Sequence, residues 1–197
     1  MPTLDSLASQ LAATGPSCGA TRLIAVDGYA GSGKTTFAAR LAARLAAALG
    51  DALGDAPVVH LDDLATHEQF FDWTERLLDE VVTPLAERRA VRHRVYDWNT
   101  AHFDSVREIA AAPPFLILEG VGAGRRAIRP WLAALLWMDV DAESARARGE
   151  RRDGPELAEF WARWIGEQSA HFRADPSRPF ADFLVSGTTG ELFAHAA

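Results

Sequence analysis

The segment from Gly28 to Thr35 reads GYAGSGKT, and it constrains the fold of this chain more than any other feature. It satisfies the pattern G-x-x-x-x-G-K-[ST], whose glycines allow a tight turn with converging backbone N–H groups. The pattern needs a strand before it and a helix after it. The apolar run Leu23–Val26 precedes it, and the alanine- and leucine-rich stretch Thr35–Leu49 follows without a helix breaker. The sequence therefore predicts a strand–loop–helix unit that binds phosphate groups.

Lys34 is the only lysine in the chain, because the other 19 of its 20 lysine and arginine residues are arginines. A chain that uses arginine wherever any cation suffices keeps lysine where a compact ammonium group is required. In such a loop the lysine reaches the β- and γ-phosphates of a nucleotide, and the following hydroxyl faces Mg²⁺. We therefore expect ATP and Mg²⁺ as cofactors. The predicted nucleotide-binding residues are Gly28, Ala30, Gly31, Ser32, Gly33, Lys34, Thr35 and Thr36.

Length and charge limit the remaining possibilities. The chain has 197 residues, of which 48% are hydrophobic, enough for a single domain over 1–197. A net charge of −7 argues against nucleic acid and anionic membranes as partners. One cysteine, Cys18, forms no internal disulfide, and no uninterrupted apolar run approaches the length of a membrane span, so we expect a cytoplasmic protein. Assembly into a homo-oligomer stays open.

Short apolar runs alternate with helical patterns along the chain. The predicted strands are Leu23–Val26, Val58–Leu61, Phe115–Leu118, Leu135–Met138 and Phe183–Val185, and the predicted helices are 2–15, Thr35–Leu49, Gln69–Val82, Ala142–Arg152 and Glu156–Gln168. Such alternation favours a parallel sheet covered on both faces. We expect a three-layer α/β/α sandwich with five parallel strands, and a core role for the stripe that contains Trp161 and Trp164.

Acidic residues follow two of the predicted strands. Asp62 and Asp63 come after Val58–Leu61, and Glu119 comes directly after Phe115–Leu118. Ligands of parallel sheets bind at the carboxyl ends of strands. A carboxylate there can accept the proton of a hydroxyl or help to hold Mg²⁺, and we expect Asp62 to act as base or metal ligand and Glu119 as metal ligand. The alternative is that these acids only cap turns or strand ends.

Two further groups complete the candidate site. The arginines of 146–152 fall on a predicted helix, where Arg148 and Arg152 share one face and can stabilise charge on a moving phosphoryl group. A solvated helix end is the alternative. Tyr96, Asp97 and Trp98 place aromatic rings beside an acid, which suits a pocket for a flat or sugar-like acceptor, although aromatic residues are more often core.

Some classes of nucleotide-binding protein are excluded. GTP-binding switches read guanine with an Asn-Lys-x-Asp element, which a chain with Lys34 as its only lysine cannot contain. No Leu-Ser-Gly-Gly-Gln-type signature of transport ATPases occurs either. A compact phosphotransferase remains.

The order of these parts resembles the uridine kinase-like family of P-loop nucleoside kinases, relatives of phosphoribulokinase and bacterial pantothenate kinase. The matching pieces run from 26 to 153: Val26–Thr36, Leu61–Leu64, Val95–Trp98, Ile117–Gly120 and Arg148–Asp153.

The resemblance implies an ATP-dependent kinase that phosphorylates a hydroxyl of a nucleoside such as uridine or cytidine. Lys34 and the loop would hold ATP, Asp62 would be the general base, and Thr35 and Glu119 would position Mg²⁺. A lid over about 146–156 would carry Arg148 and Arg152, and Asp63, Tyr96, Asp97 and Trp98 would contact the acceptor.

The chain departs from the family pattern on the acceptor side. Leu64 and Ala65 replace an aromatic pair, and His102 stands one place late. The alternatives are therefore a kinase for another small metabolite or an antibiotic, or a non-catalytic ATP-binding regulatory module.

Overall fold

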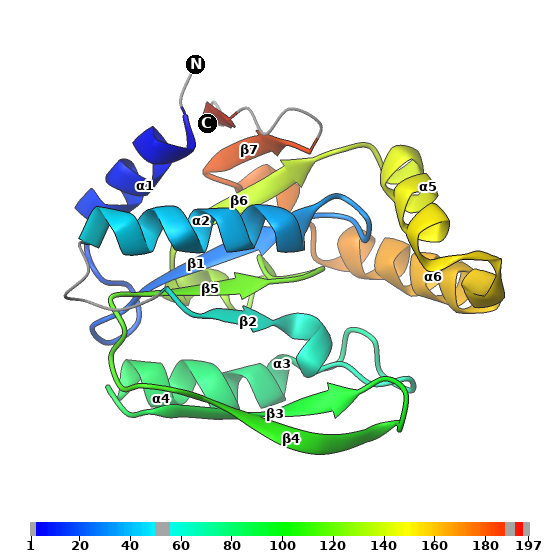
Figure 1. The fold of residues 1–197 in the computed structure, drawn as a ribbon, viewed down its shortest axis with the longest axis horizontal. Helices are drawn as coiled ribbons and strands as arrows, with labels where there is room; N and C mark the ends of the chain where they lie inside the picture. The colour runs from blue at the N-terminus through cyan, green and yellow to red at the C-terminus, as the bar shows by residue number, and fades with distance from the viewer. Residues whose placement is uncertain (1–2, 50–55, 188–191, 195–197) are drawn as a thin grey trace.

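A six-stranded sheet forms the centre of the computed structural model, which describes residues 3–49, 56–187 and 192–194. Neighbouring strands follow the order β2 (Val58–His60), β5 (Phe115–Glu119), β1 (Arg22–Asp27), β6 (Leu132–Asp139), β7 (Phe183–Ser186) and β8 (Leu192–Ala194) (Figure 1). The first five are parallel, and β8 pairs antiparallel with β7. The predicted five-stranded parallel sheet is confirmed, whereas β8 was not assigned from the sequence.

Two helices, α1 (Leu4–Ala13) and α2 (Lys34–Leu49), cover one face of this sheet (Figure 1). Side chains of a strand alternate between its two faces. Ile24 and Val26 of β1 accordingly pack in the same apolar cluster as Leu41 of α2. Helix α1 is shorter than the predicted range 2–15, because Thr3 caps its N-terminus and the backbone is already extended at Thr14.

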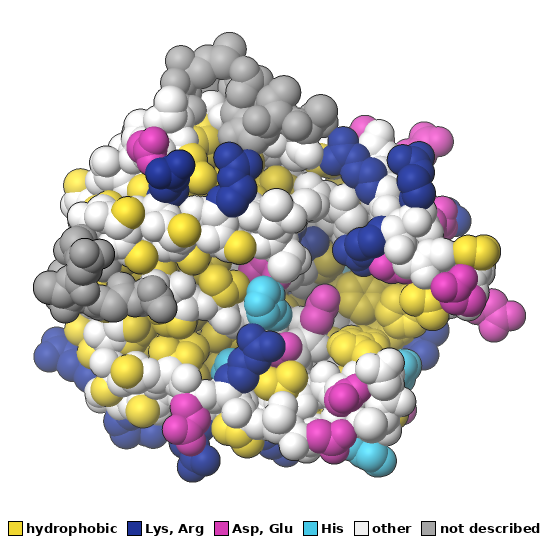
Figure 2. Space-filling view, viewed as in Figure 1, with side chains coloured by type: hydrophobic (Ala, Val, Ile, Leu, Met, Phe, Trp, Pro, Cys, Tyr) yellow, Lys and Arg dark blue, Asp and Glu magenta, His cyan; other side chains and the backbone are white. Residues whose placement is uncertain are grey.

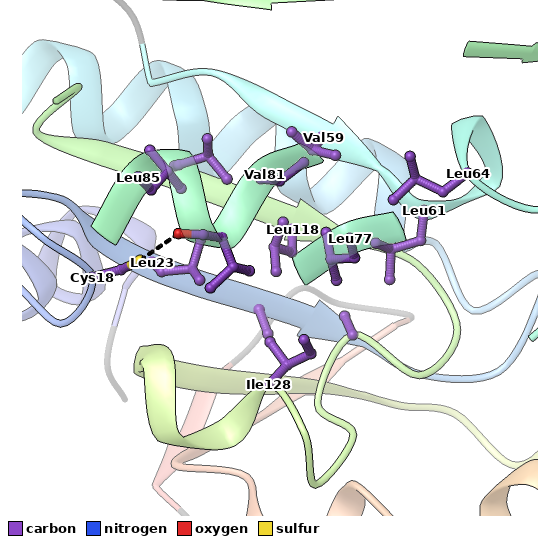
Figure 3. Packing of buried hydrophobic residues seen from close by; sticks show 14 of the residues in the cluster. Cys18, Leu23, Val59, Leu61, Leu64, Leu77, Val81, Leu85, Leu118 and Ile128 are labelled. Carbon is purple, nitrogen blue, oxygen red and sulfur yellow. Dashed lines mark hydrogen bonds between the residues drawn. The ribbon is translucent and has the colours of Figure 1, made fainter. Parts of the chain in front are cut away.

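A helical segment over 74–86 covers the other face. It consists of α3 (Thr74–Leu77), the π-helical turn η2 (Leu78–Val82) and α4 (Thr83–Ala86). Figure 3 shows side chains of this segment meeting those of the sheet, and the Cys18 thiol donating a hydrogen bond to the Val82 carbonyl, 3.5 Å away. Burial raises the pKa of that thiol to about 11. The helix predicted over Gln69–Val82 starts later and continues past Pro84. Its packing on the second face of the sheet supports the three-layer prediction.

The pair α5 (Ala142–Asp153) and α6 (Ala158–Ala174) stands beyond the end of the sheet toward which the arrows of β5 and β6 point (Figure 1). Asp141 caps α5 by accepting a hydrogen bond from the Ser144 N–H at 2.8 Å. The short helix η4 (Pro155–Leu157) joins the two. Both predicted helices exist, and α6 continues six residues beyond its predicted end at Gln168.

A hairpin, β3 (Val91–Asp97) and β4 (His102–Ile109), forms a separate antiparallel sheet below the central one in Figure 1. The sequence analysis assigned no strand here. The remaining short helices are η1 (Leu61–Asp63), η3 (Arg129–Trp131) and η5 (Arg178–Phe180). Within the described ranges, no helix is both long and apolar enough to cross a membrane.

Leu77 tests the contribution of the second helical layer, since its side chain is fully buried against the sheet. We expect Leu77→Ala to lower the free energy of unfolding by about 2–5 kcal/mol, because it removes buried methyl groups and leaves a cavity. Urea unfolding followed by circular dichroism measures the change. Val106→Ala on exposed β4 is the matched control and should change stability little. Equal losses in the two variants would contradict the packing described.

Candidate active site

The loop between β1 and α2 has the backbone that phosphate binding requires. Gly31 and Gly33 have φ values of +83° and +93°, a region that side-chain-bearing residues rarely adopt. A Cβ at Gly31 would lie 2.1 Å from the Ala145 carbonyl oxygen, so glycine also lets the loop approach α5. The Ser32 hydroxyl is buried and has no partner among the described residues. These features fit a loop that closes around phosphate oxygens.

A cavity of about 290 Å³ lies on this loop. Most of its lining was predicted from the sequence: Ala30, Gly31, Gly33, Lys34, Thr35, Thr36, Asp62, Glu119, Arg148 and Arg152. The lining residues that the sequence analysis did not select are Gly120, Val121, Gly149 and Trp164. Two predicted loop residues lie outside the lining: Gly28 at the end of β1, and Ser32, whose side chain is buried. The parallel strands therefore bring the phosphate loop, both acids and both arginines together.

Lys34 is 7% exposed, and its Nζ donates a hydrogen bond to the Tyr29 carbonyl oxygen at 2.9 Å. Burial lowers the pKa of this amine, and the negative charges of Glu119 and Asp62 oppose that shift. The ammonium group therefore lies in the negative field of two carboxylates, and nucleotide phosphates would supply further negative charge to it.

Glu119 connects the loop to β2. Its Oε1 accepts a hydrogen bond from the Thr35 hydroxyl at 3.2 Å, and its Oε2 lies 2.7 Å from His60 Nδ1. That contact raises the pKa of His60. Mg²⁺ at phosphate sites usually binds through one or two protein oxygens together with phosphates and water. Adjacent hydroxyl and carboxylate oxygens fit this pattern, while no group of three or more acidic, histidine or cysteine side chains within 3–49, 56–187 and 192–194 is arranged to hold a metal ion by itself.

Asp62 lies on η1 at the boundary of the cavity. Protein groups surround it closely although solvent reaches it through the cavity. The loss of bulk water around the carboxylate raises its pKa, and the negative charge of Glu119 adds to the rise, while Lys34 opposes it. A carboxylate with a raised pKa is the better proton acceptor for a hydroxyl near neutral pH.

Asp63, in contrast, points away from the cavity although it is adjacent in sequence. Its Oδ2 lies 3.5 Å from His93 Nε2 and 3.5 Å from Arg107 Nε, both on the hairpin. The predicted acceptor contact of Asp63 therefore has no support in the structure. Its carboxylate instead links η1 to β3 and β4. Asp62 and Asp63 differ in this way because consecutive residues of a helical turn point in different directions.

Asp27 is the main residue that the sequence analysis passed over. It is fully buried at the end of β1, and its carboxylate accepts hydrogen bonds from the N–H groups of Gly28, Gly122 and Gly124 at 2.7–2.9 Å. Its position directly before the glycine motif was the available signal. The contacts tie the phosphate loop to the segment that follows Glu119.

Helix α6 supports the same loop from the opposite side. Gln168 is 2% exposed, and its Oε1 accepts a hydrogen bond from the Ala30 N–H at 2.8 Å. Trp161 packs against Gly149 of α5 so closely that a Cβ on Gly149 would lie 2.1 Å from the indole ring. The predicted burial of Trp161 and Trp164 in the core is confirmed, and both also line a cavity, which the sequence did not indicate.

Arg148 and Arg152 of α5 both line the loop cavity. Arg148 Nη1 donates a hydrogen bond to the Gly187 carbonyl oxygen at 3.0 Å. Arg152 forms two hydrogen bonds with Asp153, from Nε at 2.6 Å and from Nη2 at 2.9 Å. Arg146 and Arg151 are exposed and lie outside this cavity. Within the arginine-rich segment, Arg148 and Arg152 therefore reach the site, as their four-residue spacing predicted.

A second cavity, of about 390 Å³, adjoins the first and shares Ala30, Asp62, Arg152 and Trp164 with it. Its other lining residues are His67, Trp98, Asn99, Asp153, Leu157, Phe160 and Trp161. Apolar side chains gather near α6 beside the hollow on the face seen in Figure 2. We call this the aromatic cavity. Trp98 was predicted as an acceptor contact and lies in its wall.

The two other residues predicted to contact the acceptor, Tyr96 and Asp97, lie outside both cavities. The Tyr96 hydroxyl is 2.8 Å from His67 Nδ1, so it supports a wall residue from behind. Asp97 Oδ1 accepts hydrogen bonds from the N–H groups of Asn99 and Thr100, and these contacts lower its pKa. It shapes the hairpin turn that presents Trp98, which corrects its predicted role.

Solved structures share this fold. A possible uridine kinase from Bacillus stearothermophilus superposes with a TM-score of 0.60 and 18% identity over 92% of this chain and 96% of that chain. A protein described as a fructose transport system kinase from Silicibacter sp. TM1040 has a TM-score of 0.60 and 21% identity over 84% of this chain and 94% of that chain. No protein-family model and no curated protein matches the sequence. The chain therefore has the fold of the uridine kinase-like P-loop kinases.

Gly149 tests how α5 is positioned over the loop. We expect Gly149→Ala to weaken the binding of a non-hydrolysable ATP analogue about tenfold or more, because the new methyl group would push Trp161 and α5 apart and displace Arg148 and Arg152. Isothermal titration calorimetry measures the affinity. Gly166→Ala on α6 is the matched control, since a Cβ there would meet nothing within 4 Å. Unchanged affinity in Gly149→Ala would show that this contact does not fix α5.

Proposed function

We propose that the chain is an ATP-dependent phosphotransferase that transfers the γ-phosphoryl group of ATP to a hydroxyl of a small acceptor. The position of Asp62 on the boundary between the two cavities carries the proposal. A hydroxyl that enters from the aromatic cavity meets this carboxylate next to the space expected for the phosphates. In-line transfer needs such juxtaposition more than it needs any covalent chemistry by the protein.

The loop cavity provides the donor side. Its backbone N–H groups and Lys34 suit the phosphates, and Thr35 with Glu119 suits Mg²⁺, which when bound would neutralise charge on those phosphates. Arg148 and Arg152 add positive charge from α5. The convergence of a base, a metal-binding pair and two cations makes a purely regulatory ATP-binding module the weaker hypothesis.

In the transfer step, the acceptor O–H bond breaks and its proton passes to Asp62. The acceptor oxygen forms a bond to the γ-phosphorus. The bond from that phosphorus to the β–γ bridging oxygen breaks, and its electron pair leaves with ADP. Positive charge around the cavity stabilises the phosphoryl oxygens during the transfer.

Two classes of acceptor fit the proposed reaction. A nucleoside such as uridine or cytidine is the prediction from the family resemblance, and the similarity to a possible uridine kinase supports it at the level of fold. A different metabolite or an antibiotic is the alternative, supported by Leu64 and Ala65 in place of the family's aromatic pair.

Asp62 gives the most direct test. We expect Asp62→Asn to lower acceptor-dependent ADP formation by about 10²–10⁴-fold, because the amide cannot take the hydroxyl proton, while affinity for ATP persists. Coupled ADP release measures the rate. The raised pKa of Asp62 means that its ionised form is less favourable in the folded protein than in the unfolded chain at neutral pH. The melting temperature of Asp62→Asn should therefore be equal to or above that of the wild type.

Asp63→Asn is the matched control for the neighbouring position. Since the Asp63 carboxylate contacts His93 and Arg107, this variant should lose stability and keep most of its turnover per folded molecule. The assignment of the base would be wrong if Asp62→Asn kept full activity on the true acceptor, or if Asp63→Asn alone abolished it.

The pH dependence of kcat/KM follows from the same carboxylate. Asp62 accepts a proton only when ionised, so activity falls as pH falls through its pKa. Because desolvation and Glu119 raise that pKa from 3.8, the acid limb should lie above the pH of an ordinary aspartate. A pH profile of kcat/KM in the free enzyme measures it. A limb at or below pH 3.8, in protein that circular dichroism shows to be folded, would contradict the environment described.

A further inference from the structure

The chemistry of the aromatic cavity narrows the class of acceptor. Its walls come from two separate parts of the chain: Leu157, Phe160, Trp161 and Trp164 near and along α6, and Trp98 after β3. The Trp98 ring lies 6.0 Å from Phe160 and 6.3 Å from Trp164, between ring centroids. These side chains give the cavity an apolar and aromatic wall, which suits an apolar, ring-containing ligand.

Protein partners already occupy most polar groups of this cavity. The Trp98 N–H donates to the Asp62 carbonyl oxygen at 3.2 Å, and the Trp161 N–H donates to Asp153 Oδ2 at 3.2 Å. His67 Nδ1 is 2.8 Å from the Tyr96 hydroxyl. These contacts hold the walls in place and engage the N–H groups of both indoles.

The charges of the cavity are also balanced within the protein. Arg152 makes a two-point contact with Asp153 and is the one arginine or lysine among the described lining residues. The other charged side chain in the lining is the Asp62 carboxylate. Arg152 also lines the loop cavity, where the phosphates of the nucleotide are expected. An anionic acceptor would therefore compete with Asp153 and with the nucleotide for a single cation.

One buried donor lacks an acceptor. Trp164 is 6% exposed and lines both cavities, and its indole N–H has no partner among the described residues. A buried N–H normally finds a partner. This N–H is enclosed within the cavity wall, so a ligand does not reach it unless the indole ring moves.

From these observations we infer that the acceptor is an uncharged alcohol with a flat, mainly apolar body. This inference rests on the proposed function, because it assigns the second substrate of that transfer. A sugar or the ribose of a nucleoside would place several hydroxyls against the apolar and aromatic part of these walls, and each hydroxyl left unpaired there disfavours binding. Asp62 is left for the single reacting hydroxyl.

The probe is 2-(2-naphthyloxy)ethanol, which has a flat ring system, an ether oxygen and one primary alcohol. Its methyl ether, which cannot receive a phosphoryl group, is the control ligand. We expect ATP-dependent formation of the phosphate monoester of the naphthyl alcohol, detected by phosphorus NMR. The kcat/KM of the naphthyl alcohol should be at least about tenfold above that of uridine or fructose.

Leu157 offers a variant that spares the fold, since it is 42% exposed at the aromatic cavity. Leu157→Gln should raise the KM of the naphthyl alcohol about tenfold and leave the KM of ATP unchanged, because it removes apolar contact from one cavity only. Val106→Gln is the matched control, as Val106 is 49% exposed on β4 and lies outside both cavities. It should change neither constant. A KM shift of equal size in both variants would overturn the inference.

The remaining outcomes separate this inference from the proposed function. A higher kcat/KM for uridine or fructose than for the naphthyl alcohol overturns the inference and supports the proposed function. If calorimetry shows that the alcohol and its methyl ether bind with affinity that Leu157→Gln weakens, but no compound releases ADP, the apolar site stands and the proposed function fails. If the alcohol neither binds nor reacts, the inference fails.

Discussion

The geometry of the loop cavity depends on the buried carboxylate of Asp27. It accepts hydrogen bonds from Gly28, where the phosphate loop begins, and from Gly122 and Gly124, which follow β5. Hydrogen bonds to an ionised acceptor in a buried site are among the stronger ones in proteins. Because Glu119 ends β5 just before Gly122, the Asp27 carboxylate ties the phosphate loop to the strand end that carries Glu119. Arg125 lies near enough to balance its charge, and burial lowers the pKa of that guanidinium to about 10.

Helix α6 supports the site from the other side, and three residues of one of its faces contact different parts of the site. Gln168 accepts a hydrogen bond from the Ala30 N–H of the loop, Trp161 packs against Gly149 of α5, and Trp164 lines both cavities. A residue buried against the core and a residue buried against a ligand have the same helical spacing. The spacing predicted the burial of Trp161 and Trp164 correctly and could not reveal that both line cavities, where Leu157 of the same predicted stripe is 42% exposed.

The predictable parts of the site are those that the order of strands and motifs determines. Lys34, Thr35, Asp62 and Glu119 follow strands of one parallel sheet, so their meeting at its carboxyl end was expected. The β3–β4 hairpin was not, because its turn contains no glycine and the buried residue His93 is polar, so the alternation of exposed and buried residues along β3 does not appear as one of polar and apolar residues. The directions of the Asp63 and Trp98 side chains depend on that hairpin, so the sequence pattern could not predict them either. Asp63 contacts the hairpin, and Trp98 lines the aromatic cavity.

The aromatic cavity and the proposed base are physically coupled. Burial disfavours the charged form of Lys34 and lowers its pKa, and the protein groups that crowd Asp62 disfavour its ionised form and raise its pKa, while each charge supports the other. An apolar acceptor would displace more water from around Asp62 and raise its pKa further, which makes the ionised carboxylate a stronger base for the adjacent hydroxyl. A polar acceptor would keep water and hydrogen-bonding groups nearby and weaken this effect. The same walls that select an apolar body would therefore also increase the reactivity of the base that acts on its hydroxyl.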